Sequence, residues 1–161
     1  MIDALDHLTL AGAAGAYETL LGHRVVAGRL QTGNVGLIFG KGGEALSSMA
    51  FATASLEKAA RLLERRAVAT TKRARLELSV EATHGVPIAL VERSSPPAPS
   101  PATVDEASAI SALDHVVVRS PNPERAIAFY AGRLGLDLRL DRSNSDWGSR
   151  LLFFRCGDLV V

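Results

Sequence analysis

The chain has 161 residues, of which 47% are hydrophobic and 22% charged, and its formal net charge is +1. This composition is typical of a folded globular protein with enough apolar material for a core. The near-neutral charge argues against nucleic acid or an anionic membrane surface as a partner, and no apolar run approaches the roughly 18 residues of a membrane span. The amino terminus lacks the features of a signal peptide. The single cysteine, Cys156, excludes an internal disulfide, and we expect a cytoplasmic protein.

A repeat organises the chain. Residues 2–7 read IDALDH and residues 110–115 read ISALDH, and an apolar stretch follows each copy. A tyrosine and then a Leu-Gly pair come next in both copies, with Tyr17 in the first and Tyr130 in the second. Such self-similarity indicates a duplicated supersecondary unit. Each unit places one histidine, His7 or His115, near the start of a predicted strand.

Before the second copy, the hydrophobic pattern predicts strands that alternate with helices. Gly22 is the expected C-cap of the first helix, and Ser55 is the expected N-cap of the second. The predicted helices are 13–21 and 56–68. The predicted strands are 6–11, 23–30, 35–39, 48–53, 75–81 and 88–92. The glycine-rich run at 40–43 predicts a turn, because it lacks the spacing of a phosphate-binding loop.

The second predicted helix has a basic face made by Lys58, Arg61 and Arg65. Acidic residues interleave with these side chains and no aromatic residues accompany them. This pattern favours a solvated helix face over a nucleic-acid interface.

Prolines at positions 96, 97, 99 and 101 predict an extended linker. We therefore expect a first domain at 1–93, a linker at 94–109 and a second region at 110–161. In the second region Asn122 and Pro123 are expected to begin a helix that Gly135 ends. The predicted strands there are one that His115 begins, 136–141, 150–156 and one that begins at 159. This region is much shorter than the first domain. Either more chain or another molecule, such as the partner in a homodimer, is expected to complete it.

Several motifs together carry a family resemblance. They are LDHVVV at 113–118, PNPERAIAFY at 121–130, RLGLDL at 133–138 and GDLVV at 157–161. With LDHLTL at 5–10 and HGVPIALVE at 84–92, they resemble the vicinal oxygen chelate superfamily. That superfamily includes glyoxalase I, extradiol dioxygenases, bleomycin- and fosfomycin-resistance proteins and methylmalonyl-CoA epimerase. The resemblance implies an α+β fold of tandem βαβββ modules with cupped, mainly antiparallel sheets. It places modules at 1–46 and 47–93 and an incomplete second domain at 110–161.

The resemblance also implies metal ligands on the first and last strands of paired modules. His7 fits one such position, but Ser48 and Ala89 stand where a second ligand and the carboxylate are expected. No metal is therefore expected in the first domain. His115 fits the equivalent position of the second domain, and its carboxylate partner would follow Val161. The resemblance implies a divalent metal in the full-length protein and does not distinguish Fe, Zn, Ni, Mn and Mg.

Tyr130, Trp147 and Tyr17 are candidate residues of a substrate cavity, although tyrosines at helical spacing equally predict core packing. Asp6 and Asp114 are expected to face away from the neighbouring histidines, because successive strand residues alternate. No catalytic residue is assigned.

Three functions remain open, all with a small-molecule partner. The first is a metal-dependent lyase or isomerase that acts on a small oxygenated substrate through a chelated enediolate. The second is an extradiol-type Fe(II) dioxygenase. The third is a metal-free binding or resistance protein.

Overall fold

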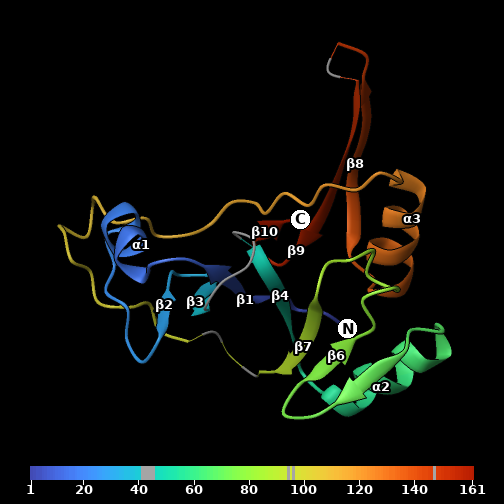
Figure 1. The fold of residues 1–161 in the computed structure, drawn as a ribbon, viewed down its shortest axis with the longest axis horizontal. Helices are drawn as coiled ribbons and strands as arrows, with labels where there is room; N and C mark the ends of the chain where they lie inside the picture. Colours follow the sequence, from blue (N-terminus) through green and yellow to red (C-terminus); the bar gives the residue numbers. More distant parts are fainter. Residues whose placement is uncertain (41–45, 94, 96, 147) are drawn as a thin grey trace.

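The computed structural model describes residues 1–40, 46–93, 95, 97–146 and 148–161, which form two β-sheets with short helices (Figure 1). The strands of the larger sheet are β1 (Ala4–Ala11), β2 (Arg29–Gln31), β3 (Gly36–Gly40), β4 (Leu46–Thr53), β5 (Thr70–Lys72), β6 (Leu76–Leu78) and β7 (Ile88–Glu92). The strands of the smaller sheet are β8 (Asp137–Asn144), β9 (Ser149–Cys156) and β10 (Leu159–Val160). The helices are α1 (Ala14–Leu21), α2 (Leu56–Arg65) and α3 (Pro123–Ile127), which continues as a π-helix at Ala128–Arg133.

The larger sheet has the order β2-β3-β1-β4-β7-β6-β5. Strand β1 pairs in parallel with β3, and β4 pairs in parallel with β7. The other neighbours are antiparallel, including β1 and β4 at the centre. In each half of the sheet, a helix follows the first strand. The last strand of that half then lies beside the first, as β3 does beside β1 and β7 beside β4. The predicted α+β fold with mainly antiparallel sheets is confirmed.

The predicted strand at 23–30 is wrong over most of its length, because the chain turns there. Ala27 and Gly28 have φ values of 49° and 78°, in the left-handed region. Val26 and Arg29 exchange two backbone hydrogen bonds of 2.8 and 3.0 Å across this turn. Only Arg29–Gln31 remains as β2. The turn was missed because Ala27 at positive φ leaves no compositional signal and Gly28 stands within an otherwise apolar run.

Helix α2 begins where expected, and the Ser55 hydroxyl oxygen accepts the Lys58 N–H at 3.3 Å. It ends at Arg65, three residues early, because Ala67 adopts a φ of 55°. The predicted strand at 75–81 is confirmed only at Leu76–Leu78, and β5 was not predicted. Residues 41–43 of the predicted glycine-rich turn lie outside the described residues.

The proline-rich linker forms no helix or strand in the part that the structure describes, yet it is held along the first domain. The Ser100 N–H donates to the Gln31 carbonyl oxygen at 2.8 Å, and the Thr103 N–H donates to Gly22 at 2.8 Å. Both ring nitrogens of the buried His23 lie 2.9 Å from carbonyl oxygens, those of Ser100 and Ile110. The linker therefore packs against the first region of the chain. The division into domains stays a prediction.

The helix of the second region begins and ends at the predicted residues. The Asn122 carboxamide oxygen accepts the Arg125 N–H at 3.0 Å, and Gly135 follows the last turn with a φ of 78°. Its second half is a π-helix, whose wider turn buries the consecutive residues Phe129 and Tyr130. The strand predicted to begin at His115 is wrong. This stretch forms only an isolated parallel bridge between His115 and Val160, because β10 is two residues long.

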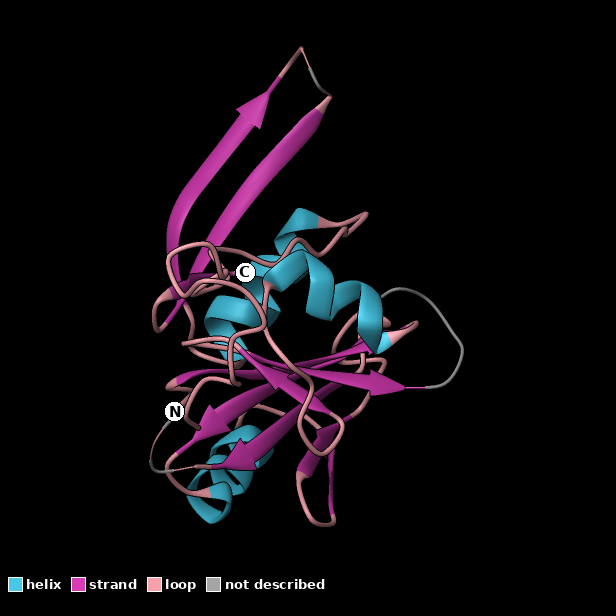
Figure 2. Cartoon of the chain, turned by 90° about the vertical axis from the view of Figure 1, so that its left-hand side faces the viewer, coloured by secondary structure: helices cyan, strands magenta, loops and turns pink. Residues whose placement is uncertain are grey.

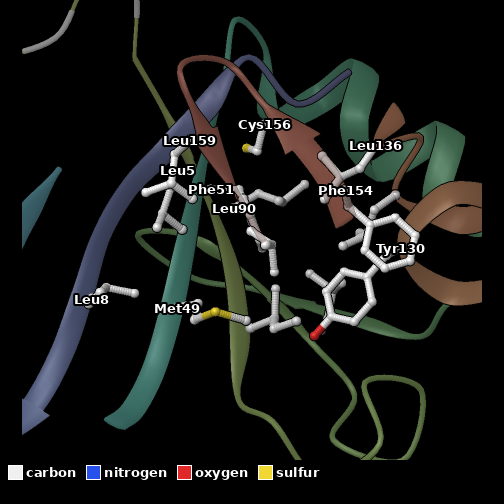
Figure 3. Packing of buried hydrophobic residues seen from close by; sticks show 14 of the residues in the cluster. Leu5, Leu8, Met49, Phe51, Leu90, Tyr130, Leu136, Phe154, Cys156 and Leu159 are labelled. Carbon is white, nitrogen blue, oxygen red and sulfur yellow. The ribbon is translucent and has the colours of Figure 1, made fainter. Parts of the chain in front are cut away.

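The two regions share one hydrophobic core (Figure 3). Leu5, Phe51 and Leu90 of the larger sheet belong to the same buried cluster as Phe154 and Leu159 of the smaller sheet. Beyond this core, strands β8 and β9 form a hairpin that projects from the rest of the molecule (Figures 1 and 2). The smaller sheet is thus anchored at one end and exposed at the other.

Candidate functional site

Both copies of the repeat form an aspartate–histidine pair. Asp6 Oδ2 lies 2.7 Å from His7 Nδ1, and Asp114 Oδ2 lies 3.0 Å from His115 Nδ1. An ionised carboxylate can only accept a hydrogen bond, so Nδ1 carries the proton in a neutral ring and Nε2 keeps its lone pair. Such a nitrogen can accept a hydrogen bond from a ligand or bind a metal.

The expectation that each aspartate faces away from its histidine is wrong. On β1, Leu5 pairs with Phe51 and His7 pairs with Ala50, so Asp6 is the extra residue of a β-bulge. A bulge breaks the alternation of side chains and lets two consecutive residues meet. Asp114 lies outside any regular strand, where alternation is not imposed.

The first pair is buried in a charged cluster. Arg93 Nη1 lies 2.8 Å from Asp6 Oδ1, and Arg29 Nη1 lies 3.3 Å from Asp6 Oδ2. Burial alone would raise the pKa of Asp6, but the His7 hydrogen bond and the two guanidinium charges outweigh it and lower that pKa. Gly36 makes room for Arg29, since a Cβ there would lie 2.3 Å from the guanidinium carbon. These contacts give the Asp6–His7 pair a structural role.

No carboxylate from β7 reaches His7. Ala50, which lies opposite His7, pairs on its other side with Ala89 of β7. The Glu92 carboxylate instead accepts the Leu56 N–H at 2.8 Å, at the start of α2. The side chain of His7 is only 8% exposed.

The second pair lies at a groove of about 490 Å³ between residues 114–118, α3 with its π-helix, and β9. We call it the β9 groove. Of the predicted site residues, the structure brings His115 and Tyr130 together there. The His115 side chain is 60% exposed. Most of the remaining lining is apolar and includes Val116, Val117, Val118, Leu151, Leu152, Phe153 and Phe154.

Tyr130 lines the groove with its ring against Phe154, at a centroid distance of 5.3 Å (Figure 3). The residue is 4% exposed, and its hydroxyl has no hydrogen-bond partner among the described residues. Burial raises the pKa of this phenol to about 12, so it stays protonated and can donate. A buried polar group without a partner costs about 1–3 kcal/mol. Tyr130 therefore offers an unused donor at the groove.

Arg150 also lines the groove, but its charge is compensated. Its guanidinium donates twice to Asp141, at 2.6 Å each, and once to Glu124 at 2.5 Å. These hydrogen bonds raise the pKa of Arg150 and lower that of Asp141. Two carboxylates for one guanidinium do not favour an anionic ligand at this rim.

Two other candidate residues do not join this site. Tyr17 is half-buried on α1, with its ring 5.2 Å from that of Phe39, and it does not line the β9 groove. Trp147 lies outside the described residues.

The described residues do not complete a metal centre. Across 1–40, 46–93, 95, 97–146 and 148–161, no three His, Cys, Asp or Glu side chains gather closely enough to hold a metal ion. At the β9 groove, His115 and Asp114 are bonded to each other and no third ligand accompanies them. Three or four ligands are usual for a catalytic metal. His115 as a ligand stays a prediction.

No helix within the described ranges has the length and apolar character needed to cross a bilayer. No family model matches the chain, and no curated protein matches it in sequence. Solved structures do match it.

A catechol 2,3-dioxygenase aligns with 99% of this chain and 67% of its own, with a TM-score of 0.70 and 16% identity. BphC, a halotolerant catechol dioxygenase, aligns with 99% of this chain and 64% of its own, with a TM-score of 0.69 and 14% identity. A methylmalonyl-CoA epimerase from Streptomyces coelicolor aligns with 59% of this chain and 100% of its own, with a TM-score of 0.47 and 16% identity. The chain therefore spans about two thirds of each dioxygenase. It shares the fold of these two dioxygenases over nearly its whole length.

Proposed function

We propose that the β9 groove binds a small, largely apolar molecule that carries hydroxyl or carbonyl oxygens. The observation that carries this proposal is the buried, unpartnered hydroxyl of Tyr130 at an otherwise apolar groove. A ligand oxygen that accepts from this hydroxyl removes the cost of leaving it unpaired. Pockets of this kind bind through apolar walls and orient the ligand through a few polar groups.

His115 supplies the complementary group. Asp114 fixes the proton on Nδ1, so Nε2 accepts a hydrogen bond from a ligand hydroxyl. Tyr130 donates and His115 accepts, which suits a neutral ligand with both kinds of oxygen. Arg150 is already paired with Asp141 and Glu124, so its charge does not need an anionic ligand to balance it. Of the three functions that the sequence leaves open, small-molecule binding is the one that these residues supply by themselves.

A second candidate is an extradiol-type dioxygenase that acts on an aromatic diol. The two catechol dioxygenases that share the fold over nearly the whole chain favour it. Its Fe(II) would need ligands besides His115, and the described residues do not provide them. No step of ring cleavage is therefore assigned to this chain. The lyase or isomerase reaction stays a prediction that no described contact favours.

Catechol is a suitable probe, because it is small, aromatic and carries two hydroxyls. We expect that titrating it into ¹⁵N-labelled protein shifts the amide signals of 114–118 and β9. The Y130F variant should bind about threefold to tenfold more weakly, the equivalent of one hydrogen bond. H115A should also weaken binding. Y17F is the matched control, because Tyr17 lies away from the groove, and its affinity should be unchanged.

Equal affinities of wild type and Y130F would overturn the proposed role of the hydroxyl. Absence of shifts at the groove would overturn the binding site itself. Oxygen uptake with catechol, measured with and without added Fe(II), tests the second candidate. Uptake that H115A abolishes and Y17F keeps would support a dioxygenase, and binding without uptake would contradict it.

A further inference from the structure

The linker meets the first region of the chain at one buried histidine. His23 follows Gly22 at the end of α1, and it is 7% exposed. Its Nδ1 lies 2.9 Å from the carbonyl oxygen of Ser100, inside the linker, and its Nε2 lies 2.9 Å from that of Ile110, just after the linker. A single ring therefore bridges two separate points of the chain.

These two contacts require a specific protonation state. A carbonyl oxygen can only accept a hydrogen bond, so a ring nitrogen at this distance has to donate. A neutral imidazole has one N–H, whereas an imidazolium has two. In a neutral His23 ring, one nitrogen would direct its lone pair at a carbonyl oxygen 2.9 Å away, and that acceptor would lose its donor. The geometry thus fits the doubly protonated ring.

We propose that His23 is a charged imidazolium when the linker is docked, and that loss of its proton loosens the linker. Histidine is the side chain that ordinarily changes its charge between about pH 5 and pH 8. Docking takes up a proton at His23, so it is favoured as the pH falls. The linker is then held tightly on the acidic side of this range and loosely on the alkaline side. The proposal does not depend on the ligand of the β9 groove.

The charged groups on the elements around His23 do not supply it with a carboxylate partner. The Glu18 carboxylate of α1 accepts the Val25 N–H at 2.6 Å, and Arg29 of β2 lies 3.3 Å from Asp6. Other charged residues, in the linker and beside His23, are exposed: Asp105, Glu106 and Arg24. Within the part of the chain that the structure describes, no ion pair includes His23. The charge of His23 therefore stabilises the linker through the two carbonyl groups.

Three backbone hydrogen bonds beside His23 report whether the linker is docked. Their N–H donors belong to Arg24, Thr103 and Ile110, and the hydrogen bonds are 2.8, 2.8 and 2.9 Å long. Losing a hydrogen bond to a charged group changes an opening equilibrium by roughly tenfold to 100-fold. Hydrogen exchange of these amides, corrected for the intrinsic rate at each pH, measures that opening. Their protection should fall at least about tenfold between about pH 5.5 and about pH 8.

An amide of α2 is the internal control for this measurement. The Ala59 N–H donates to the Ser55 carbonyl oxygen at 3.0 Å, away from the linker, and its protection should stay the same over this pH range. Equal protection of the three linker amides at both pH values would overturn the proposal. So would a loss of protection that Ala59 shares, because the whole fold and not the linker would then be responding.

Variants separate His23 from the other histidines. H23L removes both donors, so its linker amides should be weakly protected at both pH values. H84N is the matched control, because His84 contacts the Arg125 carbonyl oxygen and not the linker, and asparagine tolerates its φ of 60°. H84N should keep the pH response of the wild type. A pH response that survives in H23L would overturn the proposal.

The ring of His23 can also be observed in the wild type, which keeps the test independent of whether H23L folds. In ¹⁵N NMR spectra at about pH 5.5, both ring nitrogens of His23 should carry protons. The two-proton signal should disappear over the same pH range in which the linker amides lose protection. A neutral His23 ring at the acidic end of this range would overturn the proposal.

Discussion

His115 bridges Val160 in the same parallel sense in which His7 pairs with Gly36. The two histidines therefore occupy equivalent places in the fold, and each is hydrogen-bonded to the aspartate before it. Their exposure separates them: the His7 side chain is 8% exposed and that of His115 is 60% exposed. Strand β4 covers the far side of β1, whereas the corresponding side of 114–118 is open. One motif thus gives a structural pair in the first copy and an accessible pair in the second.

Replacing the buried aspartate should be far more damaging than replacing the exposed one. D6N leaves the guanidinium groups of Arg29 and Arg93 without their carboxylate, and breaking such a buried pair costs about 3–5 kcal/mol. D114N is the matched control, because the Asp114 side chain is 93% exposed. Urea unfolding should show a large fall in the unfolding free energy for D6N and no measurable change for D114N. Equal effects would contradict a structural role for the first pair.

Acid should destabilise the wild type partly through Asp6. The pKa of this carboxyl is lowered below its ordinary value of 3.8 in the folded state, so the unfolded chain binds more protons between the two values. Its stabilising contribution is full above the ordinary value and is lost as the pH falls through the lowered one. Urea midpoints measured from about pH 6 to about pH 2 should fall less steeply for D6N than for wild type. Parallel pH profiles would contradict this assignment.

Local signals in the sequence predicted the helix ends well. Ser55, Asn122, Gly22 and Gly135 act through backbone groups three or four residues away, so their effect does not depend on the rest of the fold. The prediction of a strand that begins at His115 failed for the opposite reason. Its valine run favours a strand, but a strand exists only where a partner pairs with it, and β10 supplies two residues.

The candidate site shows the same difference between features set by local sequence and features set by distant contacts. The repeat identified His115, and helical spacing identified Tyr130. The contact of Asp6 with His7 depends on a bulge against β4, which is set by the pairing of distant strands. The missing partner of the Tyr130 hydroxyl can be recognised only after Phe129, Phe154 and the π-helix have been placed around it. Sequence thus indicates which residues carry chemistry, and packing decides which of them remain free to act.

Two glycines of the first helix should respond in opposite ways to alanine. Gly22 has a φ of 69°, and a Cβ there would lie 2.7 Å from a methyl group of Val104. G22A should therefore destabilise the fold by about 1–3 kcal/mol. Gly15 lies inside α1 with nothing within 4 Å of an added Cβ, so G15A should stabilise by about 0.5–1 kcal/mol. Urea unfolding of both variants checks the pair. Destabilisation by G15A would contradict the expected gain in helix propensity at Gly15, and an unchanged stability of G22A would contradict strain at Gly22.

The thiol of Cys156 should be unreactive in the folded protein. Burial raises its pKa to about 12, and the negative charge of Asp3 adds to the shift. The thiolate is the reacting form, so alkylation near pH 8 should be at least about 100-fold slower than in urea. V117C provides the internal control, because it adds a second, exposed thiol. That variant should show one fast and one slow equivalent with a thiol reagent, and wild type only the slow one. A fast equivalent in wild type would mean that the core around Leu5 and Leu159 opens readily, and the docking of the smaller sheet on the larger would then be loose.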